Sequence, residues 1–231
     1  MNFYKLPLIS VCFIPAFLLH ISFAQTPPNA SNGTGSGADP KAKAILDEMS
    51  ARTKTFHSMT IEFEYNIENK KDNIHEHETG KLLLKGQKYR IEIPGQEIIC
   101  DEKTVWTYLK DVNEVQINVP QTDDQSINPT SIFSIYEKGF KFQFVKEEEK
   151  NGKTCQIINL FPVNPAQKPY HTVRLTIDKS KKQIQMLEVL GKDGGITTYS
   201  IKKMDTDTPL DDSKFTFDKT KFPGVEVIDL R

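Results

Sequence analysis

Apolar and polar residues alternate along most of the chain from residue 58 onward. In the first run, Ile61, Phe63 and Tyr65 alternate with glutamate and asparagine, a period-two pattern that predicts a strand with one apolar face. Similar runs predict strands near 77–85, 87–94, 96–101, 103–109, 113–119, 140–149, 153–161, 171–178, 183–190 and 196–204. Short turns join most of them, so neighbouring strands should be antiparallel. The pattern predicts a mainly β (α+β) fold, with about 11 strands in one strongly curved sheet or barrel.

Two segments have helical spacing instead. An Asp-Pro pair at 39–40 supplies an N-cap and a first-turn proline, which predicts an amphipathic helix over 39–57. A second, short and very apolar helix is predicted over 126–139, ending at a glycine. We expect these helices to form a lid over the sheet. Their apolar lid residues are Ile45, Met49, Ile132, Phe133, Ile135 and Tyr136.

The first residues have the pattern of a secretory signal peptide. Lys5 precedes an apolar stretch that ends in Ser22-Phe23-Ala24, so we predict a signal peptide over 1–24 with cleavage after Ala24. A membrane anchor is the alternative, but prolines and polar residues interrupt the stretch. Residues 25–38 are rich in Pro, Gly, Ser and Asn and predict a flexible leader. Residues 39–231 then form a single domain.

Charge and cysteine content limit the classes of function. The chain has 30 Lys+Arg against 31 Asp+Glu, a net charge of −1, without the basic excess typical of nucleic-acid binding. We therefore expect no nucleic-acid partner. Cys100 and Cys155 lie in apolar, strand-like runs where cysteine packs as a small hydrophobic side chain. A disulfide between them stays open as an alternative, because an exported protein meets oxidising conditions.

The sequence contains no recognisable catalytic set. The motifs GxSxG, HExxH, CxxC and the phosphate-binding loop are absent. The run His75-Glu76-His77-Glu78 is a weak metal pattern, but it lies among charged residues and is better explained by a solvated hairpin. We therefore expect no enzyme, no metal and no cofactor, and a binding function instead.

Large apolar side chains of the strands should converge on the concave side of a curved sheet. An ordinary packed core is one explanation, but so many strands enclose more volume than their own side chains readily fill. A hydrophobic cavity is therefore predicted. Its candidate lining residues are Ile61, Phe63, Tyr65, Leu82, Leu84, Tyr89, Ile91, Ile93, Trp106, Tyr108, Phe140, Phe142 and Phe144.

Three segments resemble a known family. They are Gly80-Lys-Leu-Leu-Leu-Lys-Gly, then Glu97-Ile-Ile-Cys-Asp-Glu-Lys-Thr-Val-Trp106-Thr-Tyr, and Lys214-Phe-Thr-Phe217 followed by Gly224-Val-Glu-Val. In this order they resemble the periplasmic outer-membrane lipoprotein carrier family, LolA, over about residues 39–231. The resemblance implies an unclosed antiparallel β-barrel with a helical lid over a hydrophobic cavity.

The resemblance also implies a function. Members of the family are periplasmic carriers that take acylated lipoproteins released by an inner-membrane ABC transporter, shield their acyl chains and deliver them to the outer membrane. A monomer and an outer-membrane acceptor are expected. The alternatives are a periplasmic regulator that senses lipid or lipoprotein, a carrier of another hydrophobic ligand on the same half-barrel, and an unrecognised hydrolase.

One position departs from the family pattern. Where the family has an arginine that latches the lid, directly after the lysine of the second strand, this chain has Gly86. By alternation with Tyr89 and Ile91, Arg90 should point outward and take no latch role. Lid closure is therefore expected to depend on apolar contact.

Overall fold

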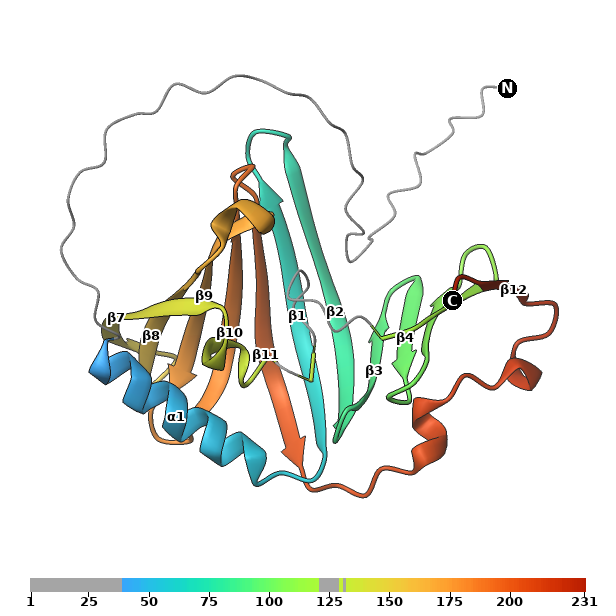
Figure 1. Ribbon diagram of the computed structural model, residues 1–231, viewed down its shortest axis with the longest axis horizontal. Coiled ribbons are helices and arrows are strands. Elements are labelled where there is room, and N and C mark those ends of the chain that lie inside the picture. Colours follow the sequence, from blue (N-terminus) through green and yellow to red (C-terminus); the bar gives the residue numbers. More distant parts are fainter. Residues whose placement is uncertain (1–38, 121–128, 131) are drawn as a thin grey trace. The chain divides into compact units, whose positions relative to one another are not determined.

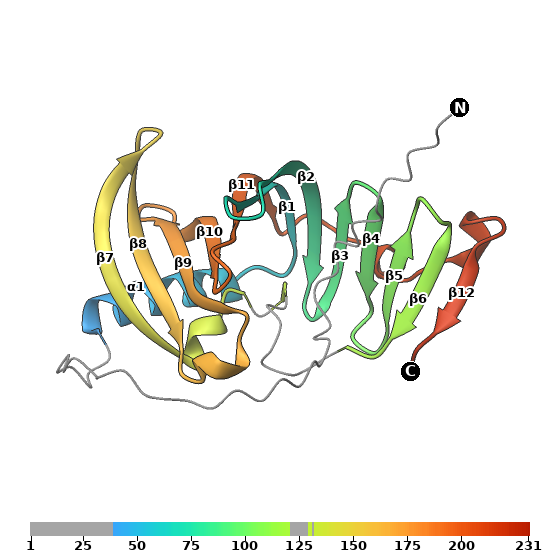
Figure 2. The ribbon, with the colours of Figure 1, turned by 90° about the horizontal axis from the view of Figure 1, so that it is seen from above.

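The computed structural model describes residues 39–120, 129–130 and 132–231 (Figure 1). Its strands form one sheet of 12 strands in the order β12-β6-β5-β4-β3-β2-β1-β11-β10-β9-β8-β7. The sheet is not closed into a barrel, because β7 and β12 are its two ends (Figure 2). The predicted signal peptide, the predicted leader and part of the second predicted helix lie outside the described residues.

The strands follow the period-two runs of the sequence. They are β1 (Met59–Asn69), β2 (Ile74–Lys85), β3 (Lys88–Ile93), β4 (Gln96–Cys100), β5 (Val105–Leu109), β6 (Glu114–Asn118), β7 (Phe140–Lys150), β8 (Lys153–Pro162), β9 (Tyr170–Asp178), β10 (Gln183–Gly191), β11 (Ile196–Thr206) and β12 (Glu226–Asp229). Each run predicted a strand of the structure to within a few residues. The mainly β fold with an unclosed, mostly antiparallel sheet is confirmed.

The prediction missed the last strand. β12 has only four residues and pairs with β6 in parallel, Val227 opposite Val115. It is too short to show a period of two in its apolar residues. Backbone hydrogen bonds to residues more than 100 positions earlier in the chain hold it in place. Glu226 N donates to Asn113 O at 3.0 Å, and Leu230 N donates to Ile117 O at 2.9 Å.

One face of the sheet carries the main core, and we call it the inner face. Directly paired residues of antiparallel strands share a face. One such row runs Ile61, Leu82, Ile91, Ile98, and a second runs Tyr199, Leu187, Leu175, Ile158, Phe144. The helix α1 (Pro40–Lys54) crosses this face over β7 and β10 (Figure 1). Its Ala42, Ile45, Leu46 and Met49 are buried in the same core.

The opposite, outer face is covered over β2 to β6 by the C-terminal segment, residues 207–231. This segment contains the short turns η3 (Asp212–Phe215) and η4 (Lys219–Lys221). Phe215 is fully buried against Leu83, and the rings of Phe217 and Phe222 stack 4.7 Å apart beside Tyr108. Lys85 Nζ donates to Leu210 O at 2.8 Å, which fixes the start of the segment.

The second predicted helix does not form in the described residues. Of the range 126–139, residues 129–130 and 132–134 are turns, and only η1 (Ile135–Glu137) is helical, as a single 3-10 turn. A short helix needs tertiary packing to offset its nucleation cost. Here Phe133 and Tyr136 are buried in the core from turns and a single 3-10 turn, so their packing does not require an α-helix. The remaining short helix, η2 (Pro165–Gln167), lies in the proline-rich loop before β9.

Asp39 joins the start of α1 to the edge strand β7. One carboxylate oxygen accepts from the backbone N–H groups of Lys41 and Ala42 at 3.0 and 3.1 Å. The other accepts from Phe144 N at 2.8 Å. The N–H of Phe144, followed by those of the helix, holds the pKa of Asp39 below its ordinary value.

We predict that Asp39→Ala lowers the free energy of unfolding by about 1–2 kcal/mol, because it removes the cap and the bond to β7 together. Asp39→Asn should lower it less, since asparagine still caps the helix. The difference in stability between the parent protein and Asp39→Ala should shrink as the pH falls below about 4. A carboxyl with a lowered pKa stabilises the fold only while it is ionised. Urea unfolding of the three proteins at pH 7 and pH 3 measures this. Equal stability at pH 7 would contradict the role of Asp39.

Candidate functional site

The inner face has two halves that differ in burial. Beneath α1, the side chains of Ile158, Leu160, Val173 and Leu175 have no exposed surface. This half is an ordinary packed core. A bound ligand would have to displace side chains already at native packing density, so this half is a poor binding site.

The other half, over β1, β2, β3, β4 and β11, is only partly covered. Its large apolar side chains are half-buried and pack against the same core. We call them the apolar strip, and they are Phe63, Leu82, Ile93, Ile98, Tyr199 and Ile201. Cross-strand pairing brings most of the strip into rows, with Phe63 opposite Ile201 on β11 and Leu82 opposite Ile91 on β3. Apolar surface in continuous rows that stay partly exposed is typical of a site that binds an apolar ligand.

Three aromatic rings gather at the strip. Phe63, Tyr65 and Tyr199 have ring centroids 6.2 to 6.4 Å apart. Burial raises the pKa of Tyr199 to about 12 and raises that of Tyr65 above its ordinary value. Both phenols are therefore neutral at physiological pH, and the strip remains uncharged.

Gly80 determines where the ring of Phe63 lies. A Cβ atom built on Gly80 would stand 2.4 Å from Phe63 Cζ and 3.0 Å from Ile93 Cγ2. A side chain at position 80 would therefore displace the ring. The glycine therefore leaves room for the tip of the Phe63 ring beside β2.

Residues 132–138, which we call the cover segment, pack against the same core and contact α1 and β7. Its Phe133 and Tyr136 are buried, and Ile132 and Ile135 are half-buried against the core. On the helix side, Ile45 and Met49 are buried in the same cluster. The predicted lid residues are thus gathered in one cluster, although a 3-10 turn replaces the second helix.

Polar contacts connect the cover segment to α1. The Tyr136 hydroxyl donates to Asp47 Oδ1 at 3.0 Å. Glu137 Oε1 accepts from Ser50 Oγ at 3.2 Å and from Lys54 Nζ at 2.8 Å. Sequence reasoning missed this set, because its members are far apart in the chain and lie at the polar margin of the helix.

Hydrogen bonds lower the pKa values of the two carboxyls in this set, Asp47 and Glu137. The hydrogen bond from Lys43, with a further one from Tyr136, holds the pKa of Asp47 below its ordinary value. Lys54 does the same for the pKa of Glu137. Closure therefore stabilises the ionised form of Glu137, whereas the ionised form of Asp47 is stabilised mainly by Lys43 within α1 and only in smaller part by Tyr136.

Arg90 lies on the outer face, as predicted. Its guanidinium pairs with Glu92 at 2.8 Å and with Glu97 at 2.6 Å, and it donates to Lys214 O at 3.3 Å. It is therefore part of the contact between the sheet and the C-terminal segment. Closure does not depend on apolar contact alone, because Asp47 and Glu137 supply polar contacts that the sequence did not reveal.

The predicted cavity residues divide between the two faces. Pairing and core contacts place on the inner face Ile61, Phe63, Tyr65, Leu82, Leu84, Tyr89, Ile91, Ile93, Phe140, Phe142 and Phe144. Trp106 and Tyr108 lie on the outer face, paired with Ile99 and Glu97, and they contact the C-terminal segment. Their assignment to the cavity was wrong, because both faces of β5 are apolar and alternation cannot say which face is inner. Trp106 fluorescence would therefore report on the C-terminal segment.

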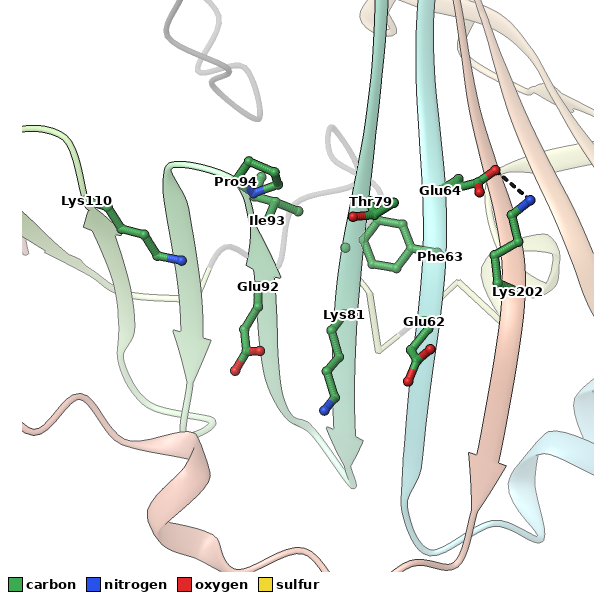
Figure 3. Close-up of a pocket in the computed structure, with 11 residues that line it drawn as sticks. Glu62, Phe63, Glu64, Thr79, Lys81, Glu92, Ile93, Pro94, Lys110 and Lys202 are labelled. Atoms are coloured by element: carbon green, nitrogen blue, oxygen red, sulfur yellow. Dashed lines mark ion pairs between the residues drawn. The ribbon is translucent and has the colours of Figure 1, made fainter.

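A charged hollow opens on the outer side of the sheet where β3 ends (Figure 3). Its volume is about 580 Å³. Phe63, Gly80 and Ile93 line it, together with three glutamates and three lysines. Of these charges, Glu64 and Lys202 form an ion pair of 2.6 Å.

The described residues hold no group of three or more His, Cys, Asp or Glu that could bind a metal ion. Cys100 and Cys155 are buried and free, on β4 and β8. Burial, as the largest cause, raises the pKa of each thiol. Both thiols are therefore protonated and inert at physiological pH. Within the described part of the chain, no helix is long and apolar enough to cross a membrane.

Comparisons with known proteins agree with this architecture. A family model described as outer membrane lipoprotein carrier protein LolA matches residues 54–218. The crystal structure of an uncharacterised conserved protein from Thermus thermophilus is similar with a TM-score of 0.52 at 13% identity, covering 82% of this chain and 99% of that one. At this identity the likeness shows a shared fold. No curated protein sequence matches the chain.

Two further solved structures are less similar. A LolA superfamily protein from Nitrosomonas europaea has a TM-score of 0.42 at 14% identity, covering 76% of this chain and 97% of that one. LprF from Mycobacterium bovis has a TM-score of 0.46 at 13% identity, covering 75% and 96%.

We predict that acid loosens the cover segment. The contact with Lys54 lowers the pKa of Glu137, and the ionised Asp47 accepts from the Tyr136 hydroxyl, so these contacts contribute fully at pH 7 and weaken as the pH falls below about 4. Hydrogen exchange of the amides of residues 132–138, corrected for the intrinsic effect of pH, should speed up several-fold between pH 7 and pH 3. The matched variant Asp47→Asn/Glu137→Gln should exchange faster at pH 7 and change little with pH. Identical profiles for both proteins would refute this role.

Proposed function

The chain belongs to the LolA family of outer membrane lipoprotein carrier proteins, and we propose that it binds the acyl chains of lipoproteins along the apolar strip. It would shield the chains after release from the inner membrane and deliver the lipoprotein to the outer membrane. One observation carries the proposal: the strip remains half-buried beside a cover segment that is tied down by a few side-chain contacts.

The energetics of acyl binding support a carrier that hands its cargo over directly. Burial of each CH₂ is worth about 0.8 kcal/mol, so a long acyl chain is worth on the order of 10 kcal/mol. Spontaneous release into water would be correspondingly slow. The carrier must therefore receive and release the chain while in contact with another hydrophobic site. Moving the cover segment away breaks a few hydrogen bonds and exposes the buried side chains of Phe133 and Tyr136, so it costs least in contact with another hydrophobic site, as such a transfer requires.

We also propose a cellular compartment and binding partners for this carrier. The signal-peptide pattern supports export to the periplasm. The partner that supplies the cargo would be an inner-membrane lipoprotein-releasing ABC transporter, and an acceptor would receive it at the outer membrane. A net charge of −1 suits a carrier that meets anionic membranes without adhering to them, and we propose that it acts as a monomer.

Recovery of the natural cargo tests the proposal. The protein, captured from the periplasm of its own cells, should carry several different acylated lipoproteins, identified by mass spectrometry of bound protein and acyl chains. Free lipid alone would instead indicate a carrier of another hydrophobic ligand. A single regulatory protein would indicate a sensor. Either result would refute the carrier function.

We predict that Phe63→Asp weakens binding of a triacylated lipopeptide at least tenfold, because a carboxylate in the apolar strip must be desolvated when an acyl chain covers it. Trp106→Phe is the matched control, since Trp106 lies on the outer face, and it should bind as the parent does. Calorimetric titration measures the affinities, and circular dichroism shows whether both variants fold. Unchanged affinity in folded Phe63→Asp would place the acyl chain elsewhere.

A further inference from the structure

β2 extends beyond its neighbour β3. Along residues 81–85, β2 pairs with β3 on one side and β1 on the other. Along residues 74–80, which we call the β2 edge, the described residues provide pairing with β1 only. Ile74, His75, His77, Glu78 and Thr79 are exposed there. The β2 edge therefore presents backbone N–H and C=O groups that no described strand satisfies.

The charged hollow adjoins this edge. Thr79 of β2 lies on one side of it, and Ile93 and Pro94 lie on the other (Figure 3). Gly80 of β2 also lines it. Its volume of about 580 Å³ is within the range of roughly 300–1,000 Å³ found for ligand sites. The hollow lies beside the β2 edge at the point where β3 ends, before the turn at Pro94-Gly95.

The hollow also joins two surfaces of different chemistry. Phe63 and Ile93 belong to the apolar strip, whereas Glu62, Lys81 and Glu92 belong to the outer face. Its three carboxylates and three ammonium groups carry no excess of either sign. A phosphate or a metal ion would meet opposing charges there. A peptide backbone, which is neutral and alternates donors with acceptors, complements both the charge balance and the open edge.

We infer that the β2 edge binds, as an added strand, the peptide segment that adjoins the acylated residue of the cargo. The acyl chains then lie on the apolar strip, and the peptide leaves past Phe63 along residues 74–80. This inference rests on the proposed function. At roughly 3.3 Å per residue, the edge spans about 23 Å of extended peptide.

Recognition by strand addition has a consequence for specificity. Main-chain hydrogen bonds supply affinity without reading side chains, and specificity arises only where pockets receive alternate side chains. A protein that binds cargo in this way accepts many different sequences next to the acyl group. That tolerance is what a carrier of diverse lipoproteins needs.

The test compares three probes on the full mature protein: a triacylated cysteinyl peptide, the same lipopeptide with alternate backbone amides N-methylated, and palmitate. The native lipopeptide should protect amides of residues 74–80 from hydrogen exchange, and palmitate should not. N-methylation should weaken binding about tenfold, because the methylated amides cannot donate to β2. The outer edge of β7, an end strand of the sheet, serves as the internal control and should not change.

The outcomes separate this inference from the proposed function. Equal affinity of the two lipopeptides without protection at 74–80 would overturn strand addition and leave acyl binding intact. Failure of all three probes to bind would overturn both. Protection at 74–80 that rises with protein concentration in the absence of ligand would show pairing with a second copy, and would also overturn the inference.

Discussion

The structure depends on a mismatch between the sheet and the helix available to cover it. At roughly 4.8 Å between strands, the 12-stranded sheet is on the order of 50 Å wide. The 15-residue helix α1 is about 23 Å long at 1.5 Å per residue. One helix can therefore bury only part of the inner face. It covers β7 to β10, and the apolar strip over β1 to β4 and β11 remains half-covered.

The two faces of the sheet are covered in different ways. On the outer face, the C-terminal segment supplies Phe215, Phe217 and Phe222 and closes over β2 to β6 through aromatic stacking and ion pairs. These contacts are extensive, so this cover is a permanent part of the fold. On the inner face, the cover segment adds a few buried side chains and a small polar set around Asp47 and Glu137. Exposed ion pairs and single hydrogen bonds contribute little each, so the burial of Phe133 and Tyr136 is the main interaction that keeps this cover closed.

Short neighbours also leave openings in the sheet itself. β3 and β4 have only 6 and 5 residues beside the 12 of β2. The difference leaves the β2 edge unpaired among the described strands and places the charged hollow beside it. An apolar strip and an open strand edge therefore adjoin at Phe63 and Gly80. An amphipathic ligand, apolar at one end and peptide at the other, fits such a junction.

The sequence by itself determined the local elements. The period of two predicted β1 to β11, and the Asp-Pro cap at 39–40 predicted α1, because these depend on side-chain alternation and capping within a few residues. Arg90 was placed correctly for the same reason. The family resemblance, carried by segments such as Gly80-Lys-Leu-Leu-Leu-Lys-Gly, supplied the unclosed sheet, which no local pattern specifies.

Only the tertiary structure decided which apolar face became the inner one. On β5, Val105 faces the core beneath the inner face, whereas Trp106 and Tyr108 face the C-terminal segment. Both kinds of position are apolar, so alternation alone could not distinguish them. The pairing of β12 with β6 and the contacts of Tyr136 and Glu137 with α1 likewise join residues that are far apart in the chain. Their energy comes from partners that are brought together only when the sheet assembles.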